Sequence, residues 1–228
     1  KFKDRVSDNY SIVNSADIII ICLPTPLKLK QKPDLVYLDN CYKNLSKITL
    51  ENKMIILEST VYPGVTRSYA NKIIKLSSKL KIGKNIFFGY SPERENPGDK
   101  NFSYNKTPKV IAGYSKPCLK LIKKIYQNIV TKIYSCNTLE EAETSKLLEN
   151  LYRSINIGLV NEMKIICNKL NIDVHNVIET AATKNFGFQK FVPGPGLGGH
   201  CIPIDPYYLS WISKKKGYDP LILKSSAK

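Results

Sequence analysis

The first half of the chain alternates short apolar runs with longer amphipathic segments. Apolar runs rich in isoleucine or aromatic side chains cover residues 17–22, 53–57 and 86–90, and a weaker fourth covers 110–112. Between them, residues 66–80 and 117–129 have the character of helices. Continuous apolar strands that alternate with amphipathic helices are typical of a parallel sheet covered on both faces. The pattern therefore predicts an α/β fold for this part of the chain.

The pattern changes after about residue 138. Residues 139–170 contain no proline and a single glycine, and Leu147, Leu151, Ile155 and Leu159 recur every four residues. This spacing predicts one long, largely buried helix. A shorter helix is predicted over residues 173–182, and the change of pattern places a domain boundary near residues 134–137.

Each of three predicted strands is followed by a loop of Pro, Ser, Thr and Glu residues, with the sequences LPTP, ESTVYPG and SPER. Proline and serine often simply end a strand, so one such loop would indicate little. Three in succession, with Thr60 and Glu93 among them, favour a binding rim, because open α/β sheets bind ligands beyond the carboxyl ends of their strands.

A polar stripe runs along the predicted long helix. Lys146, Asn150 and Arg153 are spaced i, i+4 and i+7, so they share one helix face. A solvated face is the common interpretation of such a stripe. Asparagine is a poor helix former, however, and its presence in mid-helix suits a polar, anionic ligand.

Residues 191–209 read FVPGPGLGGHCIPIDPYYL. The glycines permit positive φ and close approach of the backbone to a ligand. Asp205 and Pro206 predict a helix start, with Asp205 as N-cap. Cys201 would then lie just before a helix N-terminus, where a thiolate is favoured. A buried, inert role remains the better interpretation of the other five cysteines, whereas Cys201 is a candidate nucleophile for oxidation through a covalent thio-intermediate.

Composition excludes some classes of function. The formal charge is +16, from 35 basic and 19 acidic residues, but the lysines are scattered and the four arginines do not cluster, which disfavours a nucleic-acid reader. The six cysteines form no CxxC pair and there are two histidines, so no metal site is expected. The longest apolar run is too short to cross a bilayer. We therefore expect a cytoplasmic protein with free thiols and no membrane contact.

Five segments, in order, resemble the UDP-glucose/GDP-mannose dehydrogenase family of nucleotide-sugar dehydrogenases. They are ADIIIICLPTPL (16–27), ESTVYPGVT (58–66), SPERENPGD (91–99), KLLENLYRSINIGLVNE (146–162) and GPGLGGHCIPIDP (194–206). The resemblance implies part of a Rossmann-like NAD-binding domain over residues 1–136. It also implies a helical central domain over residues 137–228 that carries the cysteine motif and forms a homodimer through the long helix.

The resemblance further implies that NAD oxidises the C6 alcohol of a UDP-sugar twice, to the carboxylate, through a thiohemiacetal and a thioester on Cys201. Lys146 and Asn150 would stabilise the oxyanion, Asp205 would orient water or assist proton transfer, and Thr60 and Glu93 would hold water. The residues implied near the cofactor are Pro24, Thr25, Glu58, Thr60 and Glu93. Those implied near the substrate are Glu93, Arg94, Lys146, Asn150, Arg153, Gly194, Gly196, Gly198 and Gly199.

The sequence around Cys201 looks most similar to the UDP-N-acetylhexosamine branch, whose products are uronic acids for surface polysaccharides. UDP-glucose or UDP-ManNAc oxidation, an inactive scaffold of the same fold and, remotely, a basic nucleic-acid binder remain alternatives. The family's GxGxxG segment and its UDP-binding domain have no counterpart in these 228 residues. The chain is therefore expected to be a fragment that binds NAD weakly and turns over poorly by itself.

Overall fold

The computed structural model describes residues 6–94, 107–198 and 202–226. Two compact units divide the chain: unit 1 comprises Lys1–Lys28 and Pro33–Lys146, and unit 2 comprises Leu29–Lys32 and Leu147–Lys228. The predicted domain boundary at residue 136 remains a prediction.

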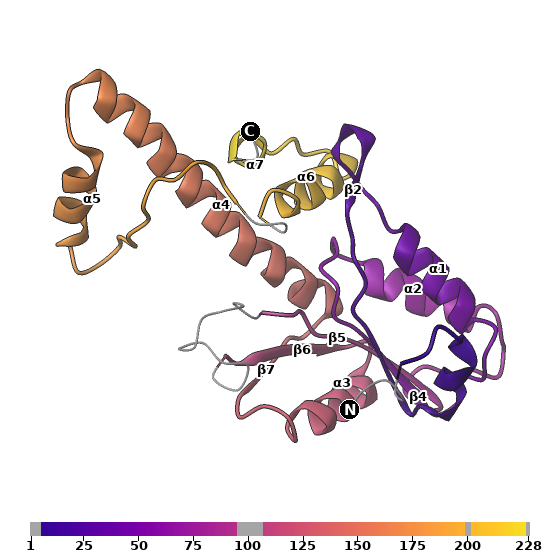
Figure 1. Ribbon diagram of the computed structural model, residues 1–228. Helices are drawn as coiled ribbons and strands as arrows, with labels where there is room; N and C mark the ends of the chain where they lie inside the picture. The colour runs from indigo at the N-terminus through magenta and orange to yellow at the C-terminus, as the bar shows by residue number, and fades with distance from the viewer. Residues whose placement is uncertain (1–5, 95–106, 199–201, 227–228) are drawn as a thin grey trace. The chain divides into compact units, whose positions relative to one another are not determined.

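Unit 1 contains a mixed five-stranded sheet in the order β1-β4-β5-β6-β7. Its elements, most of them labelled in Figure 1, are the 3-10 helix η2 Tyr10–Ser15, β1 Ile18–Ile21, β2 Leu27–Lys28, α1 Val36–Leu45, β4 Lys53–Leu57, α2 Val65–Ile74, β5 Ile86–Tyr90, β6 Lys109–Gly113, α3 Lys116–Tyr126 and β7 Ile133–Ser135. Between β2 and α1 the chain forms η3 Leu29–Gln31 and β3 Lys32–Pro33, of which Leu29–Lys32 belong to unit 2.

Strand direction is the main difference from the expected sheet. β1, β4 and β5 are parallel, as predicted, but β6 is antiparallel to β5, and β7 follows the direction of β6. An apolar run has the same pattern in either direction, so the sequence could not distinguish the two. The reversal brings the start of β6 to the carboxyl edge of β4 and β5.

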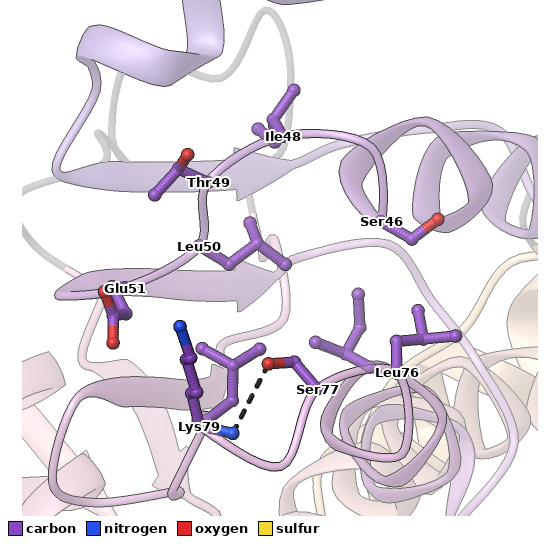
Figure 2. A pocket seen from close by; sticks show the side chains of 10 residues that line it. Ser46, Ile48, Thr49, Leu50, Glu51, Leu76, Ser77 and Lys79 are labelled. Atoms are coloured by element: carbon purple, nitrogen blue, oxygen red, sulfur yellow. Dashed lines mark hydrogen bonds between the residues drawn. The ribbon is translucent and has the colours of Figure 1, made fainter.

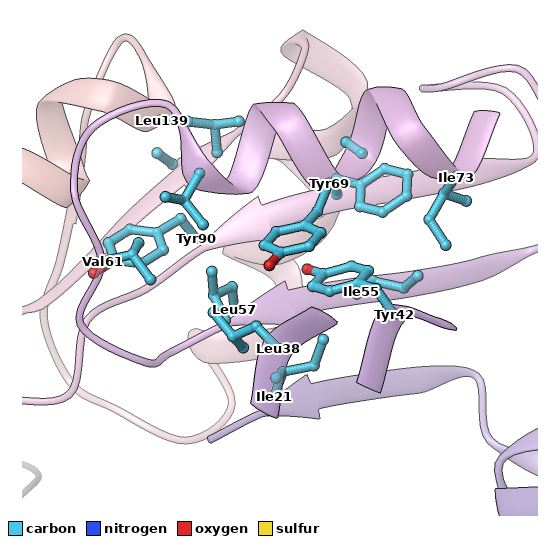
Figure 3. Close-up of a cluster of buried hydrophobic side chains, with 14 of the residues drawn as sticks. Ile21, Leu38, Tyr42, Ile55, Leu57, Val61, Tyr69, Ile73, Tyr90 and Leu139 are labelled. Carbon is cyan, nitrogen blue, oxygen red and sulfur yellow. The ribbon is translucent and has the colours of Figure 1, made fainter. Parts of the chain in front are cut away.

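Both faces of the sheet are covered, as the continuous apolar strands predicted. Ile55 and Leu57 of β4 point into a core shared with α1 and α2, which Figure 3 shows around the stacked rings of Tyr42 and Tyr69. The alternate residues Met54 and Ile56 belong to a second core with α3. All five residues of β4 are buried, because a central strand with a layer on each face has no solvent side.

The long helix α4 covers Leu139–Lys169 and is followed by α5 Val174–Ala182, α6 Asp205–Lys215 and α7 Leu221–Ser226. Asp173 caps α5 by accepting from the His175 N–H at 2.9 Å. The long helix α4 is less buried than predicted. Its Val160 and Cys167 pack against α5, but Leu148 and Leu159 are 63% and 54% exposed. Within unit 2, the described residues cover one side of α4 and leave the other apolar side open.

Among the described parts of the chain, no helix is both long enough and apolar enough to cross a membrane. Cys22, Cys41, Cys118, Cys136 and Cys167 are free thiols, as predicted.

Candidate functional site

The loops at the carboxyl edge of the sheet are tied to one another by hydrogen bonds. The Leu23 N–H, after β1, donates to the Ser59 hydroxyl, after β4, at 2.8 Å. The Thr25 hydroxyl donates to the Thr60 carbonyl at 2.7 Å. The structure therefore places these two loops side by side, which is the arrangement that a binding rim requires.

A charged cluster lies at the centre of this edge. Glu58 directly follows β4, and its side chain is 13% exposed. Its Oε1 lies 2.8 Å from the ammonium of Lys109, the first residue of β6, whose side chain is 5% exposed. The Tyr126 hydroxyl, at the end of α3, donates to the same oxygen. Three elements thus converge on one carboxylate oxygen.

The other carboxylate oxygen of Glu58 faces an exposed thiol. The Cys22 thiol donates to Glu58 Oε2 at 3.8 Å. Desolvation raises the pKa of Cys22, the charges of Glu58 and Glu93 raise it further, and Lys109 opposes them. Cys22 is therefore a neutral donor, and Glu93, itself exposed, lies within electrostatic range of it.

A buried carboxylate from α4 closes the start of α2. Glu143 is fully buried and accepts from the Gly64 N–H at 2.6 Å, the Thr66 N–H at 2.9 Å and the Thr66 hydroxyl at 2.7 Å. Gly64, the N-cap position, has φ +95° and no side chain to cap the helix. Burial raises the pKa of Glu143 to about 7, against the lowering effect of these donors.

A second contact joins the same two helices. The Arg67 guanidinium of α2 donates from Nε and Nη2 to the two oxygens of Glu140 at 2.6 and 3.0 Å, and it lies over the ring of Tyr114. Arg67 holds the pKa of Glu140 below its ordinary value. The first turns of α4 are therefore fixed to the helix that follows the Thr60 loop.

In unit 2, the Asn150 amide of α4 donates to the carboxylate of Asp205. Asp205 is 3% exposed. The predicted N-cap role of Asp205 is wrong: the cap position is Ile204, and Asp205 is the first helical residue. The Asp205 carboxylate accepts from the Asn150 amide instead of capping the helix. A buried carboxylate needs such a donor, because burial separates it from water.

The described glycines of the 194–199 loop behave as their type predicts. Gly196 and Gly198 have φ of +154° and +65°, which side chains disfavour. The Gly194 N–H donates to the Asn161 side chain at 2.9 Å, so this loop is held against α4 within unit 2. Gly199 and Cys201 lie outside the described residues.

The remaining predicted residues are placed as follows. Lys146, partly buried, ends unit 1, while Asn150 and the exposed Arg153 belong to unit 2 on the same helix. Pro24 is exposed at the rim. Arg94 donates to the Pro108 carbonyl at 2.9 Å.

Sequence reasoning missed Glu143, Lys109 and Tyr126. A signal existed for Glu143, because it falls on the four-residue stripe between Leu139 and Leu147, where an apolar residue is expected. Lys109 stands directly before an apolar run, which is a weaker signal. Nothing in the sequence distinguished Tyr126 from the other tyrosines.

One pair of hollows in unit 1 lies away from this edge. Two adjoining cavities of about 210 Å³ each share Ser46, Ile73 and Leu76. Figure 2 shows one of them, lined by residues that precede β4 and follow α2. That is the amino end of β4, whereas Glu58 follows its carboxyl end. We place the candidate site at the carboxyl edge, where the polar groups converge.

Among the residues that the structure describes, no three His, Cys, Asp or Glu side chains gather in a way that could hold a metal ion. The described groups at the carboxyl edge are carboxylates, hydroxyls, a lysine and a thiol.

Comparison with known proteins gives two adjacent matches to one family. Residues 3–130 match the UDP-glucose/GDP-mannose dehydrogenase family, NAD binding domain, and residues 140–228 match its central domain. Protein CapL of Staphylococcus aureus is 38% identical over 218 residues, 95% of this chain and 51% of CapL. UDP-N-acetyl-D-glucosamine 6-dehydrogenase of Pseudomonas aeruginosa is 36% identical over 216 residues, 94% of this chain and 51% of that enzyme.

The solved structure of UDP-D-ManNAc dehydrogenase from Pyrococcus horikoshii matches with a TM-score of 0.87 at 31% identity, and the match covers 97% of this chain and 51% of that one. This similarity confirms the predicted Rossmann-like α/β class with a long central helix. The chain spans about half the length of the curated relatives it matches.

Proposed function

The chain belongs to the UDP-glucose/GDP-mannose dehydrogenase family, and we propose that its protein oxidises the C6 alcohol of a UDP-N-acetylhexosamine to the carboxylate with NAD. The observation that carries the proposal is the consecutive pair of matches, NAD binding domain followed by central domain. The relatives named for UDP-N-acetyl-D-glucosamine and UDP-D-ManNAc support an N-acetylhexosamine as the sugar. The acid product would serve surface polysaccharide synthesis.

The residues at the carboxyl edge suit a dinucleotide. A dinucleotide offers ribose hydroxyl and carboxamide donors, and the edge presents the fixed carboxylate of Glu58 together with Thr25 and Thr60. NAD, when bound, accepts the hydride at each of two oxidations. Pro24 and Glu93 would line the same cofactor site.

Cys201 would act as the nucleophile. Its sulfur adds to the C6 aldehyde from the first oxidation, the second oxidation converts this adduct to a thioester, and water releases the carboxylate and restores the thiol. Each acid formed would therefore require two equivalents of NAD as oxidant, and water would supply the second oxygen of the carboxylate. Lys146 and Asn150 would stabilise the oxyanion, with Asp205, Thr60 and Glu93 serving water and proton transfer.

The substrate would contact Arg94, Arg153 and the loop of Gly194, Gly196, Gly198 and Gly199. Two hydrogen bonds within unit 2 support this proposal: the Gly194–Asn161 bond holds the glycine loop on α4, and the Asn150–Asp205 bond holds the start of α6 on the same helix.

A homodimer through α4 is also proposed. Leu148, Leu159 and Ile166 of this helix are 63%, 54% and 43% exposed. Their spacing places them on one helix face, and exposed apolar residues gathered on one face are typical of a protein interface. Sedimentation of the intact protein tests it: a monomer at micromolar concentration would exclude the interface.

The substrate is tested with a panel of UDP-GlcNAc, UDP-GalNAc, UDP-ManNAc and UDP-glucose, each incubated with NAD and the intact protein while NADH absorbance is followed. We expect turnover with an N-acetylated sugar. Preference for UDP-glucose would overturn the assigned sugar, and no NADH with any sugar would leave a scaffold of the same fold as the better interpretation.

A further inference from the structure

The two carboxylate oxygens of Glu58 have different neighbours: Oε1 is bound by Lys109 and Tyr126, and Oε2 lies next to Cys22. Neither Lys109 nor Tyr126 has a role in the proposed function so far. Resting on the proposed function, we propose that Lys109 and Tyr126 are positioning residues: they fix Glu58 through Oε1, so that Oε2 is presented to the hydroxyl and amide donors of the dinucleotide.

The positioning pair is buried and belongs to elements that cannot move independently. The Lys109 side chain is 5% exposed, and Tyr126 is 1% exposed. Lys109 opens β6 and Tyr126 ends α3, which packs on the sheet through Ile122 in the core with Ile56. The Lys109 ammonium also lies 5.1 Å from the centroid of the Tyr126 ring, which adds a cation–π contact.

Stability alone does not explain this arrangement. A buried ion pair gains little over an apolar pair of the same volume, because both charges must be desolvated. Two buried donors on the same oxygen fix the orientation of the Glu58 carboxylate, and this is an advantage where a ligand must meet the other oxygen. A rigid, preoriented acceptor binds its ligand with a smaller ordering cost than a mobile one.

The second oxygen of Glu58 lies beside an exposed side chain. Glu58 Oε2 lies 3.8 Å from the thiol of Cys22, and that thiol is exposed. Glu93 acts on the same thiol electrostatically. Cys22 therefore reports, by its own accessibility, whether a ligand occupies the edge beside Oε2.

The test uses four variants of the intact protein. Tyr126→Phe removes only the hydroxyl, and Lys109→Met removes only the charge. Lys109→Arg is the conservative replacement. Tyr114→Phe is the matched control, because its hydroxyl donates at 2.8 Å to Asn71 of α2 instead of to Glu58. Affinity for NAD is measured by calorimetry, and alkylation of the Cys22 peptide by N-ethylmaleimide is measured by mass spectrometry with and without NAD.

We expect NAD to protect Cys22 in the wild type. Tyr126→Phe and Lys109→Met should each weaken NAD binding by about tenfold, which corresponds to the loss of one charge-assisted hydrogen bond between Glu58 and NAD. At an NAD concentration equal to the wild-type Kd, the protected fraction of Cys22 should therefore fall from about one half to about one tenth. Lys109→Arg and Tyr114→Phe should retain the wild-type affinity for NAD and the protection of Cys22. Circular dichroism of each variant separates this effect from loss of fold.

Wild-type affinity and protection in a folded Tyr126→Phe would overturn the inference, whatever happens to Lys109→Met. Tight NAD binding by the wild type without protection of Cys22 would also overturn it, while leaving the proposed function intact. No NAD binding by the wild type would contradict the proposed function itself.

Discussion

Removing the buried Glu143 carboxylate should loosen the start of α2. In Glu143→Ala, the N–H groups of Gly64 and Thr66 and the Thr66 hydroxyl lose their acceptor. The cap position is a glycine, so no neighbouring side chain replaces it. The Thr66 hydroxyl can rotate, but the two backbone donors are fixed by the helix.

The magnitude follows from these two donors. A buried donor left without an acceptor costs about 1–3 kcal/mol, so the loss of both acceptors lowers the free energy of unfolding by about 2–6 kcal/mol. Glu140, one turn earlier on α4, is the matched control. Its pair with Arg67 is about one-third exposed, and such pairs contribute at most about 1 kcal/mol. Glu140→Ala should therefore be much milder.

The same carboxyl predicts a pH dependence. Because burial raises the pKa of Glu143 from 4.5 to about 7, the folded state binds more protons than the unfolded state between these values. The contribution of Glu143 is therefore full below pH 4.5 and declines as the pH rises to about 7, by about 3 kcal/mol. Glu143→Gln cannot titrate and should lack this decline.

Urea unfolding followed by circular dichroism measures both effects. Equal free energies of unfolding for Glu143→Ala and Glu140→Ala would refute the capping role. A Glu143→Gln protein whose stability falls across the window as steeply as that of the wild type would refute the raised pKa.

Four further substitutions test packing, a buried hydrogen bond and a helix cap. Gly113→Ala should destabilise the fold by about 3 kcal/mol, since its Cβ would lie 2.2 Å from the backbone of α3. Gly158→Ala, whose Cβ would meet nothing within 4 Å, should stabilise α4 by about 0.5–1 kcal/mol. Parallel thermal melts should show a lower Tm for the first variant and a higher Tm for the second. Asn150→Ala removes a donor from the buried Asp205 and should lower the free energy of unfolding in urea by about 1–3 kcal/mol. Asp173→Ala removes the α5 cap and should cost about 1 kcal/mol, measured as the urea midpoint; no change would exclude a capping contribution.

Much of the fold could be predicted because burial leaves a periodic trace. The buried β4 is an apolar run after its first residue, Lys53, and the long helix carries a leucine or isoleucine every four residues between positions 147 and 159. Strand direction leaves no such trace, which is why the reversal of β6 was missed. The helix α1 was missed because Val36–Leu45 mixes apolar with polar residues and has no side-chain cap.

The candidate site was predictable where local chemistry marks it. Glu58 and Thr60 stand in a loop between a strand and a helix, which sequence reasoning can locate. Lys109 and Tyr126 reach Glu58 from 51 and 68 positions away in the sequence, and only the topology of the sheet brings them there.

The measurement that tests the central proposal most directly is the conversion of a UDP-N-acetylhexosamine by the intact protein and by Cys201→Ser. We predict that the wild type forms the C6 carboxylate with two NADH for each acid, and that Cys201→Ser forms no acid. Normal acid formation by Cys201→Ser would contradict the covalent route, and the absence of NADH from the wild type with every UDP-sugar would contradict the proposed dehydrogenase function.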